Sequence, residues 1–221
     1  MWRIALVFVI LLLCFGQSRL YGSEFVSDKW QDNIPVEAHV LYEAATSLFN
    51  EEKYTEATEK LSESIKLMPN YRHALYNLGI AYGRRAVTVR SPSYSGSDDD
   101  LYHSLFFLQE AARYGDDAEL QYELGWNSMM RFIFKPRDKA TRTALLAEAE
   151  NAFKKSLAFD PQLTKSMLGL GVIEEIRGNY PQALAYYIQA EYLGDARGTK
   201  RIEALLMILN NKQPSLEHTP E

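Results

Sequence analysis

Side chains that could catalyse a reaction or bind a metal are few and widely separated in this sequence. The four histidines are His39, His73, His103 and His218, and no two of them lie one helical turn apart, the spacing that a helical zinc site needs. The serines lack a G-x-S-x-G elbow, and no glycine-rich loop is suited to hold a phosphate. The only cysteine is Cys14, which excludes a disulfide framework, a zinc ribbon and a cysteine nucleophile. The sequence therefore predicts a protein that is not an enzyme and holds no metal or cofactor.

The composition is that of an ordinary folded protein of moderate size. The chain has 221 residues, of which 47% are hydrophobic and 24% are charged, and its formal net charge is -5. Because proteins that bind nucleic acid without sequence preference are usually basic, this charge argues against a DNA or RNA partner.

Residues 1–18 have the pattern of an export signal. Arg3 precedes twelve apolar residues, 4–15, and small residues follow them. As a helix this run would measure about 18 Å, which is short of the ~30 Å hydrocarbon core of a membrane. We therefore expect a cleaved signal peptide, with a lipoprotein leader lipidated at Cys14 as the alternative. The chain has no N-glycosylation acceptor and no further cysteine, which favours a periplasmic or membrane-associated place in the cell envelope, or the secretory lumen in a eukaryote.

An internal repeat organises the rest of the chain. A small residue, a large apolar residue, a second small residue and a turn residue recur at offsets of four, three and five. The four copies are Ala57, Leu61, Ser64 and Pro69; Ser104, Leu108, Ala111 and Asp116; Ala149, Phe153, Ser156 and Pro161; and Ala183, Tyr187, Ala190 and Asp195. Upstream of each copy lies a partner pattern that ends in a small residue, namely Ala45, Gly79, Gly125 and Gly171. Small residues at a fixed helical position let two helices approach closely, so each copy predicts a helical hairpin.

The repeat resembles the tetratricopeptide repeat, or TPR, with its pattern W-x2-L-G-x2-Y, then A-x3-F, then P. The resemblance covers roughly residues 38–195. It departs from the pattern at Gln121, Ser128 and Glu174, and Asp116 and Asp195 replace the terminal proline. The resemblance implies an all-α, right-handed superhelical solenoid of four TPR-like hairpins, to which an amphipathic helix near residues 196–211 adds a C-terminal cap.

The repeat phase also sets the domain limits. Residues 19–34 form a linker, 35–211 the solenoid and 212–221 a disordered tail. Repeats two and three each carry about a dozen extra residues between their helices. In repeat two a loop, 91–97, is expected, followed by an acidic N-cap region, Asp98–Asp100. In repeat three residues 131–146 are expected to lengthen both helices.

The resemblance also implies that the first helix of each hairpin lines a concave groove that holds a partner peptide. Tyr42, Tyr76 and Tyr122 fall at one equivalent position of three successive repeats, so we expect a ladder of tyrosines in this groove. The other predicted groove residues are Thr46, His73, Asn77, Ile80, Trp126 and Met129. Aromatic rings supply contact area and a polar handle, which suits peptide recognition. The alternative is that these rings pack between adjacent repeats.

Some members of the family grip the C-terminal carboxylate of a peptide with Lys, Asn and Arg side chains. Asn77 is compatible with such a clamp, but Tyr42, Glu119 and Glu123 stand where the cations are expected. An apolar or basic ligand segment therefore fits this groove better than a peptide carboxylate.

Cations gather where the turns within hairpins two and three are expected to project from one edge. This cationic edge consists of Arg84, Arg85, Arg90, Arg131, Lys135, Arg137, Lys139 and Arg142. Such a patch suits an anionic lipid or an acidic protein, or it is simply a solvated face.

Together these features predict an exported adaptor or scaffold that binds a protein or peptide segment. Two alternatives remain open: an obligate structural subunit of an envelope complex, and a carrier of a small hydrophobic ligand.

Overall fold

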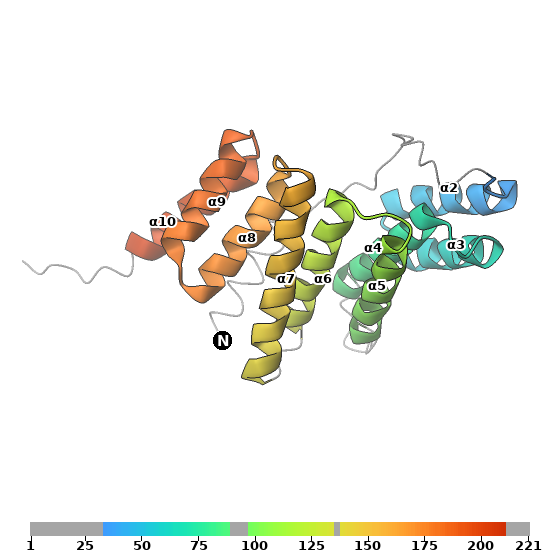
Figure 1. The fold of residues 1–221 in the computed structure, drawn as a ribbon, viewed down its shortest axis with the longest axis horizontal. Helices are drawn as coiled ribbons and strands as arrows, with labels where there is room; N and C mark the ends of the chain where they lie inside the picture. Colours follow the sequence, from blue (N-terminus) through green and yellow to red (C-terminus); the bar gives the residue numbers. More distant parts are fainter. Residues whose placement is uncertain (1–32, 89–96, 135–137, 211–221) are drawn as a thin grey trace, which may run out of the picture. The chain divides into compact units, whose positions relative to one another are not determined.

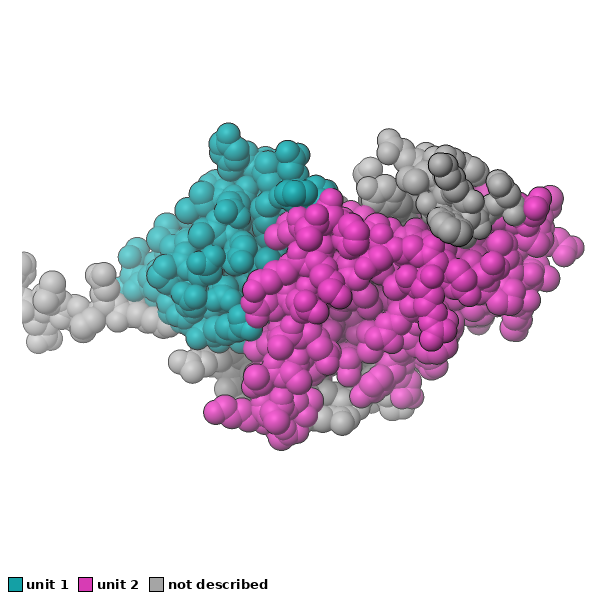
Figure 2. All heavy atoms as spheres, in the orientation of Figure 1, with its two compact units in different colours: residues 1–15, 160–221 teal, residues 16–159 magenta. Residues whose placement is uncertain are grey.

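The computed structural model describes residues 33–88, 97–134 and 138–210, and all regular structure in these ranges is α-helix (Figure 1). The helices are α2 (Val36–Asn50), α3 (Tyr54–Leu67), α4 (Arg72–Thr88), α5 (Ser97–Ala112), α6 (Ala118–Phe134), α7 (Lys139–Phe159), α8 (Thr164–Arg177), α9 (Tyr180–Tyr192) and α10 (Ala196–Asn210). The chain divides into two compact units, of which one carries α2 to α7 and the other α8 to α10 (Figure 2). None of the helices in the described ranges is both long and apolar enough to cross a membrane.

Successive helices pair as four hairpins, α2 with α3, α4 with α5, α6 with α7 and α8 with α9, and α10 follows as a final helix packed on α9. In the larger unit α3 also packs against α4, and α5 against α6, so each hairpin is joined to the next. The predicted all-α fold of four TPR-like hairpins and a capping helix is confirmed.

The repeat pattern marks the places where the two helices of a hairpin meet. All its small and large apolar positions, from Ala57 and Leu61 to Tyr187 and Ala190, are at most 1% exposed. A Cβ added to Gly125 would lie 2.7 Å from the ring of Phe153, and one added to Gly171 would overlap the ring of Tyr187. These positions hold glycine because the large apolar side chain of the second helix rests directly on the backbone of the first.

Serine occurs at the second small position in two hairpins because its hydroxyl has a partner there. Ser64 donates to the carbonyl of Ala38 over 2.7 Å, and Ser156 donates to that of Ala118 over 2.7 Å. In both hairpins the bond joins the second helix to the N-terminal turn of the first helix.

The extra residues of repeat three lengthen its helices, as predicted. α6 runs to Phe134, and α7 has 21 residues against 14 in α3 and 13 in α9. The side chain of Asp138 caps α7 by accepting hydrogen bonds from the backbone and hydroxyl of Thr141, at 3.0 and 2.8 Å. These bonds lower the pKa of Asp138.

In repeat two α4 continues to Thr88 and α5 already begins at Ser97. The predicted loop, 91–97, lies outside the described residues except for Ser97. The acidic run was expected to supply an N-cap and favourable negative charge for the next helix. It lies within the first turn of α5, so it does not include the N-cap, but its charge favours the helix dipole there. The predicted leader (1–18), the linker up to residue 32 and the tail (212–221) also lie outside the described residues.

Candidate functional site

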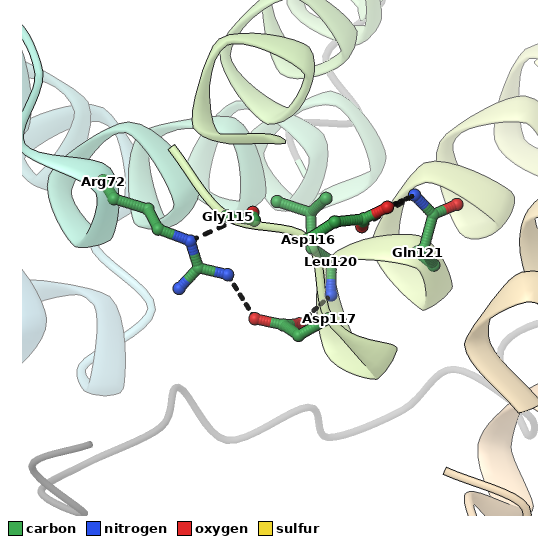
Figure 3. A network of polar contacts seen from close by, with 6 residues as sticks. All are labelled: Arg72, Gly115, Asp116, Asp117, Leu120 and Gln121. Atoms are coloured by element: carbon green, nitrogen blue, oxygen red, sulfur yellow. Dashed lines mark hydrogen bonds and ion pairs between the residues drawn. The ribbon is translucent and has the colours of Figure 1, made fainter. Parts of the chain in front are cut away.

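Two departures from the family pattern compensate each other at the turn between α5 and α6. The side-chain amide of Gln121 donates to both carboxylate oxygens of Asp116, at 2.8 and 3.0 Å (Figure 3). Gln121 stands where an apolar residue is expected and Asp116 where proline is expected. The polar pair therefore takes over the role of holding the turn against the helix that follows it.

The same turn is tied to the preceding repeat by Arg72, the first residue of α4 (Figure 3). Its Nε donates to the carbonyl of Gly115 over 3.2 Å, and its Nη2 forms an ion pair with Asp117. Asp117 in turn accepts a hydrogen bond of 2.8 Å from the backbone N–H of Leu120 and so caps α6.

The first helices of repeats one and two, together with the turn before α4, share a cluster of four rings, which we call the α2/α4 ring cluster: His39, Tyr42, Tyr71 and His73. The ring of Tyr42 lies 6.2 Å from that of His39, 5.3 Å from that of Tyr71 and 6.5 Å from that of His73. Nδ1 of His39 and the hydroxyl of Tyr71 are hydrogen-bonded at 3.2 Å. Tyr71 is buried, whereas the other three rings are partly exposed. The cluster thus rests on the buried ring of Tyr71 and presents a polar, aromatic surface to solvent.

Asn77 lies beneath this surface and is only 3% exposed. Burial and the neighbouring Glu43 raise the pKa of Tyr42, and the nearby Asn77 amide opposes this shift. Nevertheless, Nδ2 of Asn77 makes no hydrogen bond of normal geometry within the described part of the chain. The polar group that this amide acts on is the Tyr42 hydroxyl, so Asn77 supports Tyr42 from α4 rather than presenting an open donor.

The predicted ladder of three equivalent groove tyrosines is wrong for its third member. Tyr42 and Tyr76 are partly exposed, but Tyr122 is 2% exposed because its ring packs 5.9 Å from that of Phe153 in the same hairpin. Burial raises the pKa of Tyr76 well above its ordinary value, and the carboxylates of Glu123, Glu119 and Asp117 raise it further. The partly exposed members of the ladder are therefore Tyr42 and Tyr76, and Tyr76 is the more enclosed of the two.

Three further predicted groove residues are also buried. Ile80 is 4% exposed, Trp126 is 3% and Met129 is 0%, so in this structure they are packing residues rather than contact surface. Thr46 remains partly exposed, but its hydroxyl donates to the carbonyl of Tyr42 over 3.0 Å. Of the predicted groove, the structure brings together Tyr42, His73 and Asn77 on α2 and α4.

A buried ion pair connects α4 to α6 and corrects the prediction for Arg84. Nη2 of Arg84 donates to both oxygens of Glu123 at 2.9 and 3.1 Å, and the side chains are 9% and 3% exposed. The guanidinium also lies 4.2 Å from the ring centroid of Trp126. Arg84 therefore does not belong to an exposed cationic edge, because a buried carboxylate neutralises it.

Arg85 also faces inward. Its guanidinium forms two hydrogen bonds with Asp100 of α5, at 2.8 and 2.5 Å, and a third with the hydroxyl of Thr58 on α3 at 3.0 Å. Asp100 thus has a specific structural partner rather than only a general effect on the helix N-terminus.

Three further members of the predicted cationic edge lie within the described residues. Arg131 lies 5.0 Å from the ring of Tyr102 and 3.7 Å from a carboxylate oxygen of Glu148, and Arg142 lies 4.3 Å from the ring of Phe132. Lys139 is exposed. The other three predicted members, Arg90, Lys135 and Arg137, lie outside the described residues.

Sequence reasoning missed Tyr71, which anchors the ring cluster from the turn before α4. The sequence contained a clue to Tyr71, since it lies two residues before His73 and directly after the turn residues Pro69 and Asn70.

The described residues include no group of three or more His, Cys, Asp or Glu side chains placed to hold a metal ion.

Comparison with known proteins supports the fold. The sequence matches no protein-family model and no curated protein. Among solved structures, TTC0263, a thermophilic TPR protein of Thermus thermophilus, is 19% identical over 78% of this chain and 83% of its own, with a TM-score of 0.62. YrrB, a TPR protein described as having an unusual peptide-binding site, is 14% identical over 81% of each chain, with a TM-score of 0.53. A double mutant of MamA is 19% identical over 73% of this chain and 77% of its own, with a TM-score of 0.55. Since the repeat pattern is also buried in all four hairpins, the chain has the tetratricopeptide-repeat fold.

Proposed function

We propose that this protein is a non-enzymatic adaptor that binds a segment of a partner protein against its first helices. The observation that carries the proposal is the α2/α4 ring cluster with the buried Asn77 amide beneath it. Rings offer contact area at low entropic cost, and the buried Asn77 amide supports the Tyr42 side chain. The peptide-binding site described for YrrB on the same fold supports this use of the fold.

The chemistry around the cluster favours an apolar or basic ligand segment. The exposed carboxylate of Glu43 lies 3.9 Å from Nε2 of His39, and Glu119 and Glu123 act on Tyr76 from α6. Glu123 is already neutralised by Arg84, whereas the exposed Glu43 adds negative potential beside His39 and Tyr42. A peptide carboxylate would be repelled here, while a lysine or arginine of the ligand would be attracted.

In-cell crosslinking tests this surface. A photoreactive residue at position 42 or 76 is expected to capture the same partner protein, to be identified by mass spectrometry. The matched control is position 192 on α9, because Tyr192 is 89% exposed and lies far along the chain from the cluster. Capture of that partner from position 192 as efficiently as from 42 and 76, or no capture from either position 42 or position 76, would contradict the proposal.

The two rival functions, a structural subunit and a carrier of a small ligand, predict different behaviour of the isolated protein. A structural subunit would lose its folded state without its complex, whereas an adaptor stays folded and monodisperse alone. A carrier would copurify with an apolar small molecule, which denaturing extraction and mass spectrometry would detect. We propose the adaptor because the accessible cluster carries polar groups as well as rings.

Export to the cell envelope is proposed on the pattern of Arg3 and residues 4–15.

An anionic lipid or acidic partner at the cationic edge is proposed only for Lys139 and Arg142, because the other described members have carboxylate partners. Reversal of both residues to Glu should then abolish salt-sensitive binding to vesicles that contain phosphatidylglycerol.

A further inference from the structure

The outward face of α5 carries two large aromatic side chains that the described structure leaves about half exposed. Tyr102 is 50% exposed and Phe106 is 53% exposed, and they lie one helical turn apart. The opposite side of α5 is buried through Leu101, Ser104 and Leu108. The two rings therefore belong to the solvent side of the helix and not to its packing side.

The repeat does not require aromatic residues at these two positions. The equivalent pairs in the other second helices are Thr55 and Glu59 in α3, Ala147 and Asn151 in α7, and Pro181 and Ala185 in α9. All are small or polar, and those helices pack in their hairpins in the same way. Because the fold is satisfied without aromatics here, Tyr102 and Phe106 point to an additional contact.

The charges of this face are arranged symmetrically about Phe106. Exposed Asp99 precedes Phe106 by seven residues within α5, and exposed Arg113 follows it by seven residues, in the turn directly after the last residue of α5, Ala112. The side chain of Arg113 is 72% exposed and pairs with Glu110 over 3.0 Å. The face thus has an acidic residue at one end, aromatic rings in the middle and an arginine, paired with Glu110, at the other end.

We infer that this face binds α5 of a second copy of the chain in antiparallel orientation, around a two-fold axis at Phe106. Such an isologous contact places the two Phe106 rings against each other and sets Asp99 of each copy opposite Arg113 of the other. The Tyr102 ring is held beside the axis by the guanidinium of Arg131, 5.0 Å away. The charge pattern is complementary to itself only in this antiparallel orientation.

One helix pair buries less surface than a standard stable interface, so the dimer is weak and forms in a concentration-dependent way. The inference goes beyond the proposed adaptor function and does not depend on it. The contact uses a second helix, whereas the ring cluster lies on first helices and stays accessible in both copies. A dimer therefore presents two partner-binding surfaces and binds a repeated partner more tightly than one copy does.

Sedimentation equilibrium of the purified protein between roughly 10 and 500 µM tests the inference. The wild-type mass is expected to rise from one chain towards two chains over this range. Phe106→Glu should remain a monomer throughout, because it places two like charges face to face. Ile188→Glu is the matched control, since Ile188 is also 53% exposed but lies on α9, and it should associate like the wild type. Thermal unfolding followed by circular dichroism checks that each variant is folded.

A charge exchange tests the orientation independently of Phe106. Asp99→Arg and Arg113→Asp should each weaken association by about five- to tenfold, because each sets like charges opposite one another. The double variant should restore the dissociation constant to within about threefold of the wild type, because opposite charges then face each other again. A monomeric wild type, a dimer that survives Phe106→Glu or is lost in Ile188→Glu, or a double variant that is not rescued would each overturn the inference.

Discussion

At the scale of single residues, the contact between Gly125 and Phe153 shows how little space separates the helices of a hairpin. A Cβ on Gly125 would lie 2.7 Å from the ring. We expect Gly125→Ala to lower the free energy of unfolding by about 1–3 kcal/mol through overpacking. In repeat one the positions equivalent to Gly125 and Phe153 hold Ala45 and Leu61, a larger residue facing a smaller one. Adding Phe153→Leu to Gly125→Ala should therefore recover part of this loss. Chemical denaturation of the two single variants and the double variant measures the coupling, and strictly additive effects would contradict the expected contact.

The tyrosines of the predicted ladder should respond differently to truncation. Tyr122→Ala removes a buried ring and is expected to cost about 3 kcal/mol or more, whereas Tyr42→Ala, on a partly exposed surface, should cost about 1 kcal/mol. Affinity for a crosslinked partner should show the opposite order, with Tyr42→Ala losing about five- to tenfold. Tyr122→Phe and Tyr42→Phe separate the hydroxyl from the ring. Equal stability losses for the two alanine variants would contradict the difference in burial.

At the scale of helices, the Arg84 and Glu123 ion pair joins α4 to α6 across two repeats. Glu123→Ala leaves a buried guanidinium without its carboxylate, and we expect a loss of about 3–5 kcal/mol in the free energy of unfolding. The double variant Arg84→Met, Glu123→Leu should lie close to the wild type, because an apolar pair needs no desolvation of charge. Urea denaturation checks both, and a mild effect of Glu123→Ala would show that the pair contributes little.

The turn between α9 and α10 makes the smaller unit sensitive to acid through Asp195. Burial alone would raise the pKa of Asp195, but hydrogen bonds from Arg197 and Thr164 outweigh it and lower the pKa to about 2. A depressed pKa stabilises the fold above the unfolded pKa of about 3.9, and this contribution is lost as the pH falls towards 2. Asp195→Asn keeps a capping oxygen but removes the charge. It should cost about 1–2 kcal/mol near pH 6, after allowance for solvent screening, and almost nothing near pH 2. Urea unfolding across this range measures the difference, and a pH-independent cost would contradict a charge effect.

At the scale of the whole molecule, the predicted export would decide which partners the protein meets. Because Arg3 and the apolar run 4–15 match an export signal, the mature chain is expected to begin between Gln17 and Gly22. N-terminal sequencing of the native protein measures this, with mass spectrometry to detect a lipid on Cys14. A chain that still begins with Met1 in a soluble cytoplasmic fraction would contradict the prediction.

The sequence alone determined the number of hairpins, the phase of the repeat and the positions of the glycine contacts. These features follow from a periodic alternation of small and large residues, which each hairpin needs in order to close on itself. The lengthening of α6 and α7 could be predicted for the same reason, since residues 131–146 carry local helix preferences.

Only the tertiary structure decided which polar side chains are buried. Arg84 and Glu123 are 39 residues apart, and Arg72 reaches Asp117 across 45 residues, so nothing in the local pattern distinguishes them from solvated charges. Tyr122 shares a repeat position with Tyr42, yet one ring packs on Phe153 and the other on Tyr71. Side chains at equivalent positions differ because each is surrounded by different neighbours from the adjacent helices, and those neighbours are set by packing between helices rather than by the periodicity of any one helix.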